Sequence, residues 1–279
     1  MPRTTSSSDR YPPDLYLAIL ANFFFFASFQ WVLATLPGYI QQIGGGPAQI
    51  GLAYGLFTLS AVASRPGIGR LIDSWGRKPM LLVGAAVFTL SPLLYAQANS
   101  TGTFMIMRLF HGVGIAAFTT AYTALVADLA PPLRRGEAVG LSGVTSLLGL
   151  LFAPALGLYV EATRGYVVHF VAAAGIAAGS ILLLLPIREP RLSDPDAAER
   201  PSLWEVARLR PVWLAALGST GLAVAYGAVL SFLPPFAVER GLAAVGAYFS
   251  AFALAMMLAQ SAAGWLSDRI GRRAVAVPG

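Results

Sequence analysis

The sequence contains no cysteine, only two histidines and few charged residues, which make up 11% of its 279 positions. The lack of cysteine excludes a disulfide framework, a thiolate metal site and a catalytic thiol in these residues. An ordinary soluble domain carries about 25% charged residues, so this scarcity of charge excludes a water-soluble globule. Hydrophobic residues make up 56% of the chain, and the mean hydropathy is +0.67. This composition is typical of a polytopic membrane protein.

Long apolar runs, separated by polar or Gly- and Pro-rich junctions, predict eight membrane-spanning helices. A transmembrane helix needs about 20 mostly apolar residues, and runs of this length recur along the whole chain. Membrane strands are excluded because they would be about ten residues long and would alternate in polarity. The predicted spans are 15–40, 48–71, 79–98, 102–128, 137–161, 165–186, 211–236 and 243–266.

The basic residues are distributed unevenly over the loops between these spans. Sixteen of the 19 Lys and Arg residues fall on the side that holds both ends of the chain. Arg164 and Arg240 fall on the other side, and Arg108 lies inside a span. Cytoplasmic loops carry the excess of Lys and Arg, so we expect both ends to be cytoplasmic in a multi-pass protein of the cell membrane. We therefore expect the lipid bilayer to be a partner of the chain and expect no binding of nucleic acid.

Two loops of the chain repeat one another. Residues 69–78 read GRLIDSWGRK and residues 264–273 read GWLSDRIGRR, so Gly, Leu, Asp, Gly and Arg coincide at an offset of 195 residues. The Leu-Pro pairs at 36–37 and 233–234 precede the two loops at similar spacing. The seventh and eighth spans therefore repeat the first and second, and six spans per repeat is an arrangement used by large secondary transporters.

The first of these loops resembles the signature of the major facilitator superfamily between its second and third helices, G-x-L-a-D-r-x-G-r-k-x-x-l, over residues 69–81. The resemblance extends over essentially the whole chain and implies a gate that locks and releases the two halves on the cytoplasmic side. The gate residues it implies are Gly69, Asp73, Gly76, Arg77 and Lys78, with Gly264, Asp268, Gly271 and Arg272 in the second copy.

This resemblance also implies the architecture of the chain. The predicted fold is all-α, with a complete six-helix bundle over residues 1–187, a cytoplasmic linker over 188–210 and the first two helices of a second bundle over 211–279. The repeat predicts four more helices and a total near 390 residues, so the chain looks truncated after its eighth helix. A contrasting hypothesis is a membrane scaffold that does not transport, which a reading frame continuing about 110 residues past Gly279 would reject.

Two further motifs lie on the fourth and fifth spans. Arg108 to Ala117 resembles the family motif R-x-x-q-G-x-g-a-a, with His111 where Gln is usual, and a charged residue inside a span typically marks a transport pathway. The resemblance implies a part in proton coupling for Arg108, and His111 could titrate near neutral pH. A snorkelling Arg108 and a structural His111 are the alternatives. Gly149, Pro154 and Gly157 fit the antiporter motif of the fifth helix, with two substitutions, and predict a bent hinge.

The resemblance places a substrate cavity between the two halves of the protein. Its predicted polar lining on the first and seventh spans consists of Asn22, Gln30, Trp31 and Tyr226. No phosphate-binding loop or HExxH motif is present, which argues against an ATPase or a metalloenzyme and predicts neither a cofactor nor a metal. We therefore expect a secondary transporter that exports small amphipathic or drug-like compounds in exchange for protons. Uptake of a sugar or metabolite is the alternative within this class.

Overall fold

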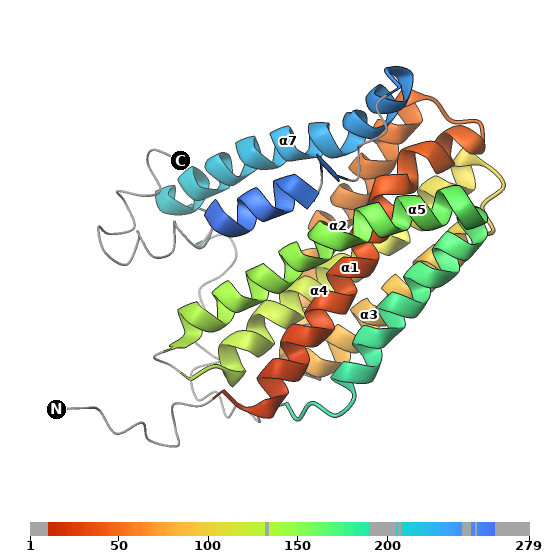
Figure 1. Ribbon diagram of the computed structural model, residues 1–279. Helices are drawn as coiled ribbons and strands as arrows, with labels where there is room; N and C mark the ends of the chain where they lie inside the picture. The colour runs from red at the N-terminus through yellow and green to blue at the C-terminus, as the bar shows by residue number, and fades with distance from the viewer. Residues whose placement is uncertain are drawn as a thin grey trace.

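The computed structural model describes residues 11–131, 134–189, 205, 208–241, 247–248 and 250–259, and all regular structure in these ranges is helical. The labelled helices are α1 (Pro13–Gln42), α2 (Pro47–Trp75), α3 (Arg77–Tyr95), α4 (Thr101–Leu129), α5 (Arg135–Leu184) and α7 (Arg210–Glu239). A shorter apolar helix spans Ser250–Ala259. Figure 1 shows α1 to α5 gathered into one bundle, with α7 and the shorter helix lying along one side of it.

The helix starts follow local sequence chemistry. Proline occupies the first helical position of α1 and α2, where its missing N–H would have had no partner within the helix. Ser100 caps α4, since its hydroxyl accepts a hydrogen bond from the backbone N–H of Thr103 at 3.2 Å. These residues end the connecting loops and fix where each helix begins.

Helix α5 consists of two arms that fold back on one another at Gly165, whose φ of 77° is a conformation that favours glycine. Figure 1 shows the chain running up one arm and returning along the other. Helix α1 lies between the arms, parallel to the first and antiparallel to the second. The contacts with the first arm are Asn22–Ser142, Ala27–Gly149 and Trp31–Gly157, and those with the second are Thr35–His169, Ser28–Ala173 and Phe24–Gly179.

The described helices agree with the predicted spans in position. The break at Gly165 separates the predicted spans 137–161 and 165–186, so α5 accounts for both. Five helices are long and apolar enough to cross a membrane when α5 is counted once. Helix α2, whose second half carries Arg65, Arg70 and Asp73, is not among them. The eighth predicted span, 243–266, is described only at 247–248 and 250–259, where it is helical.

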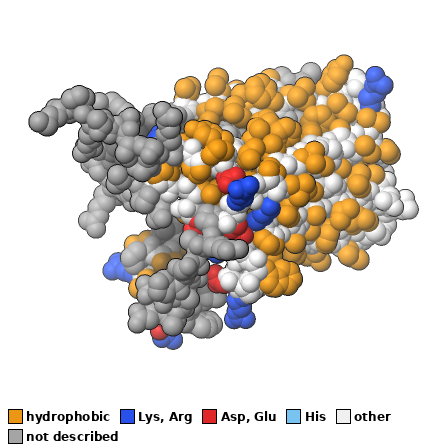
Figure 2. Space-filling model, turned by 90° about the horizontal axis from the view of Figure 1, so that it is seen from below, with side chains coloured by type: hydrophobic (Ala, Val, Ile, Leu, Met, Phe, Trp, Pro, Cys, Tyr) orange, Lys and Arg blue, Asp and Glu red, His pale blue; other side chains and the backbone are white. Residues whose placement is uncertain are grey.

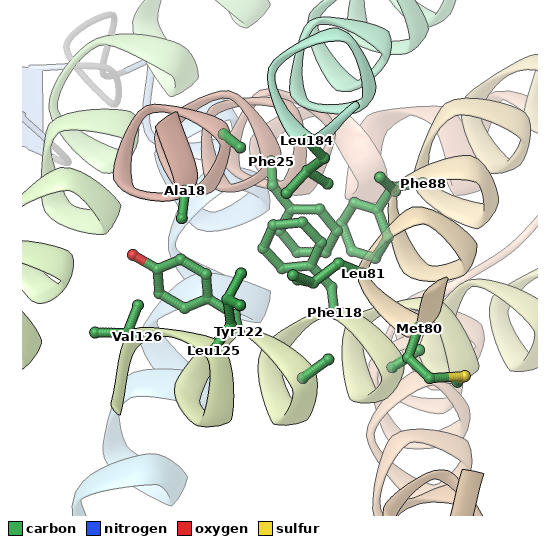
Figure 3. Packing of buried hydrophobic residues seen from close by; sticks show 14 of the residues in the cluster. Ala18, Phe25, Met80, Leu81, Phe88, Phe118, Tyr122, Leu125, Val126 and Leu184 are labelled. Carbon is green, nitrogen blue, oxygen red and sulfur yellow. The ribbon is translucent and has the colours of Figure 1, made fainter. Parts of the chain in front are cut away.

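The core of the bundle is aromatic at its centre. The rings of Phe25 on α1 and Phe118 on α4 stack with centroids 3.7 Å apart (Figure 3). The ring centroid of Phe88 on α3 lies 4.0 Å from that of Phe25. All three side chains are almost completely buried. Contact among three helices at one point fixes their relative positions.

The outer surface is apolar as well. On the face seen in Figure 2, hydrophobic side chains cover most of the described helices, and charged side chains are few. Ile106 and Leu182 are 70% and 69% exposed. Lipid rather than water satisfies such a surface, so the fold is that of a membrane protein.

Candidate functional site

Two neighbouring cavities lie between α7 and the bundle of α1 to α5, which we call the N-terminal bundle. The larger has a volume of about 840 Å³ and lies between α1, α2 and α7. The smaller, of about 410 Å³, lies between α1, the first arm of α5, α7 and the Ser250–Ala259 helix. Both volumes suit a small organic molecule. Tyr226 and Ala223 line both cavities, so α7 forms their shared wall.

The lining of these cavities is mostly aliphatic and aromatic. Polar groups come from Tyr54 and Thr58 in the larger cavity, from Gln30 and Ser146 in the smaller one, and from Tyr226 in both. The ring of Tyr226 stacks on Phe252 with centroids 5.6 Å apart. Such a wall can hold an apolar body and orient it through a few polar contacts.

The structure brings two of the four predicted lining residues, Gln30 and Tyr226, into a cavity wall. Asn22 is buried between α1 and α5, where its Nδ2 donates hydrogen bonds to Ser142 O, Thr145 Oγ1 and Ser146 Oγ. Trp31 faces the second arm of α5 and donates its Nε1–H to His169 O at 3.2 Å. In the described conformation these two side chains join helices rather than line either cavity.

Arg108 is completely buried on α4. Its Nε donates to the backbone carbonyl of Ala53 on α2 at 3.1 Å, and its Nη1 donates to the hydroxyl of Tyr95 on α3 at 3.3 Å. The guanidinium carbon also lies 4.2 Å from the ring centre of Phe57. Arg108 therefore does not snorkel to the headgroups but joins α2, α3 and α4 in the interior.

His111 lies one turn further along α4 and shares the Tyr95 hydroxyl with Arg108. The distance from Tyr95 Oη to His111 Nδ1 is 2.7 Å. An arginine can only donate, so the hydroxyl accepts from Arg108 and keeps its proton for Nδ1. His111 Nε2 is buried and has no hydrogen-bond partner among the described residues. Tyr95 connects the two candidates for proton coupling, and no sequence motif singled it out.

The predicted hinge residues lie where α5 approaches α1 closely. A Cβ atom on Gly149 would lie 2.9 Å from the backbone N of Ala27, and one on Gly157 would lie 2.8 Å from Trp31 O. Pro154 is buried between them inside the helix. Small residues thus allow backbone contact, which is how helices pack tightly in a bilayer.

The first copy of the predicted gate lies at the corner between α2 and α3. Gly76 links the two helices with a φ of 99°. Arg77 Nε lies 3.0 Å from Asp128 Oδ2 at the end of α4, and Lys78 Nζ donates to Leu185 O at 2.6 Å. Gly69 and the exposed Asp73 lie on the last turns of α2. The second copy, Gly264, Asp268, Gly271 and Arg272, lies outside the described residues.

Glu189 completes this corner, although no sequence motif pointed to it. Its Oε1 accepts from the backbone N–H of Arg77 at 2.6 Å, and its Oε2 accepts from that of Lys78 at 3.2 Å. A carboxylate at a helix N-terminus is favoured by the helix dipole and by the N–H groups that have no partner within the helix. The end of the sixth predicted span is thereby attached to the start of α3.

Within the described ranges, no three His, Asp or Glu side chains come together in a group that could hold a metal ion. The arrangement instead offers a cavity, a buried Arg–Tyr–His cluster and a polar corner at one end of the bundle.

Comparison with curated proteins finds proteins named for drug resistance. The multidrug resistance protein MdtL of Klebsiella pneumoniae subsp. pneumoniae is 28% identical over 171 residues, which cover 61% of this chain and 43% of that protein. The quinolone resistance protein NorA of Staphylococcus aureus is 26% identical over 217 residues, covering 75% of this chain and 55% of that protein. The chain spans about half the length of these curated relatives.

Comparison with solved structures finds the same fold. A bacterial homologue of the human lysosomal transporter Spinster, inward-facing and unoccupied, matches with a TM-score of 0.71 at 18% identity over 93% of this chain and 63% of that one. The human organic anion transporter MFSD10 matches with a TM-score of 0.67 at 22% identity, over 89% and 72% of the two chains. The family model described as Major Facilitator Superfamily matches residues 18–279. With this match along nearly its whole length, the chain belongs to the major facilitator superfamily of membrane transporters.

Proposed function

We propose that the protein is a proton-coupled exporter of small amphipathic or drug-like compounds, working by alternating access in the cell membrane with its ends in the cytoplasm. The observation that carries this proposal is the pair of apolar, aromatic cavities between the N-terminal bundle and α7. An amphipathic compound can leave water for such a wall without needing many matched polar partners.

The names of the relatives support export rather than uptake. MdtL and NorA are described as multidrug and quinolone resistance proteins, and a transporter would confer resistance by removing a compound from the cell. The partial antiporter motif at Gly149, Pro154 and Gly157 resembles that of exporters and points in the same direction. Gly149 and Gly157 lie at the close contact between α5 and α1.

Sugar uptake fits the cavities less well. A sugar presents many hydroxyl groups, and each would need a hydrogen-bond partner once it is taken out of water. The two linings together supply only five described side chains with polar groups, fewer partners than the many hydroxyl groups of a sugar need.

The proposed route for proton coupling is the cluster of Arg108, Tyr95 and His111. The Tyr95 hydroxyl accepts from a permanently charged group and can donate to an imidazole that can take up a proton. Proton uptake at His111 would make Nδ1 the donor to the Tyr95 hydroxyl. Because Tyr95 lies on α3 and His111 on α4, this change would affect the contact between the two helices.

The proposal is tested by measuring accumulation of a panel of fluorescent amphipathic compounds, including acidic, neutral and cationic members, in cells with and without the full-length protein. We expect lower accumulation of some members in expressing cells, and a protonophore should abolish the difference. Equal accumulation for every compound in all four conditions would exclude drug export.

Tyr226→Ala tests whether the cavity carries the substrate. The exchange removes the ring that stacks on Phe252 and lines both cavities, so we expect the KM for an exported aromatic compound to rise about tenfold, as for the loss of one aromatic contact. Val224→Ala on the same helix is the control, because Val224 is 67% exposed and lines neither cavity. Equal KM values for the two variants would move the substrate site elsewhere.

A further inference from the structure

Arg108 is a buried positive charge without a negative partner in the described part of the chain. Its hydrogen bonds go to a backbone carbonyl and a hydroxyl, both uncharged, and its Nη2 has no hydrogen-bond partner. The ion pairs Arg77–Asp128 and Arg134–Glu137 in the described part of the chain do not include Arg108.

This charge cannot be removed by losing a proton, because a guanidinium stays ionised in proteins. A buried unpaired charge is costly, and charged residues inside membrane spans usually pair with one another or face a polar route. The fold therefore maintains an electrostatic field at this point that an anion would neutralise.

The charge of Arg108 lies close to the larger cavity. The guanidinium carbon of Arg108 lies 4.2 Å from the ring centre of Phe57 and 5.8 Å from that of Tyr54. Both rings line the cavity of about 840 Å³. A single layer of aromatic rings therefore separates the charge from the inside of the cavity. The described residues that line the two cavities include no charged side chain, so none of these residues cancels the field.

We propose that the transported compounds are amphipathic acids, and that the positive charge of Arg108 selects them over cations. This inference rests on the proposed function and names its substrate class: an apolar body held by the aromatic lining, with a carboxylate or similar anion on the side of Tyr54 and Phe57. Two unit charges about 8 Å apart at an effective dielectric constant near 20 interact strongly enough to change binding roughly 30-fold.

Transport by the full-length protein in proteoliposomes tests the inference with a matched pair of fluorescent compounds, a carboxylic acid and its methyl ester. We expect the wild type to have a KM at least tenfold lower for the acid. Arg108→Gln should bring the two KM values within about threefold of each other, while Arg108→Lys, which keeps the charge, should retain most of the preference. A purely structural role for Arg108 would affect both compounds equally and leave the ratio unchanged.

A second measurement keeps the inference testable if Arg108→Gln does not fold. In the wild type, transport of the ester should be inhibited by the non-fluorescent acid at concentrations at least tenfold lower than by an amine with the same apolar body. Equal inhibition, or stronger inhibition by the amine, would overturn the inference. Export of the ester or of cations without preference for the acid would leave the proposed export intact and reject acid selection alone. Failure to export any compound of either class would reject export itself.

Discussion

Gly112→Ala is expected to destabilise the protein by about 3 kcal/mol and to abolish transport. Gly112 lies on α4 where this helix meets α2, and a Cβ atom there would collide with the carbonyl oxygen of Phe57 and the hydroxyl of Ser60. Because the carbonyl belongs to the backbone, no side-chain rotation can relieve the clash, and the helices must move apart. That movement also separates Phe57 from Arg108 and from the cavity it lines.

Thermal unfolding of the detergent-solubilised protein measures this effect. At about 2 to 4 °C per kcal/mol, the melting temperature should fall by roughly 6 to 12 °C. Gly175→Ala is the matched control, because Gly175 is helical and exposed and a Cβ there meets no atom within 4 Å. It should melt at or slightly above the wild-type temperature, since alanine favours a helix more than glycine does. Equal melting of Gly112→Ala and wild type would mean that α2 and α4 are not in backbone contact.

The helices could be predicted from the sequence because their cause is local. Apolar runs of sufficient length leave few alternatives in a bilayer, and the described helices begin and end close to the predicted bounds. The fold-back at Gly165 also has a local cause, a glycine next to Arg164 between two apolar runs. Family membership followed from the gate motif and its repeat, which are likewise contiguous in the sequence.

Which neighbouring helix or cavity each side chain faces could not be predicted in the same way. Asn22, Gln30 and Trp31 are all on α1, and helical periodicity does not reveal which neighbour lies against each face when the helix is apolar all round. The structure places Gln30 at a cavity, whereas Asn22 and Trp31 face the two arms of α5. The role of Tyr95 could not be predicted either, because its partners Arg108 and His111 belong to another helix and meet it only in the packed structure.

Glu189→Gln is expected to loosen the corner between α2 and α3, the proposed gate, and to reduce transport severely without preventing insertion. The carboxylate accepts two backbone hydrogen bonds at the start of α3, and a Cβ on Gly76 would lie 2.7 Å from its Oε2. The amide has a single acceptor oxygen, so its NH₂ group must face one of the two N–H groups. Loss of a charge-assisted hydrogen bond and of the dipole interaction weakens the contact by about 2 kcal/mol, which corresponds to about a 30-fold shift toward the open corner.

The absence of cysteine from these residues makes this opening measurable, because a single introduced thiol reports on its own position. Ile187 is 1% exposed and lies two residues before Glu189, so Ile187→Cys should react slowly with a maleimide while the corner is closed. Adding Glu189→Gln should accelerate labelling at least tenfold. Glu137→Gln is the matched control, since Glu137 also lies in the first turn of a helix, α5, but pairs with the side chain of Arg134. Fast labelling in the control as well would indicate general loosening, whereas unchanged labelling with Glu189→Gln would show that the Glu189 contact does not hold the end of the sixth span against α3.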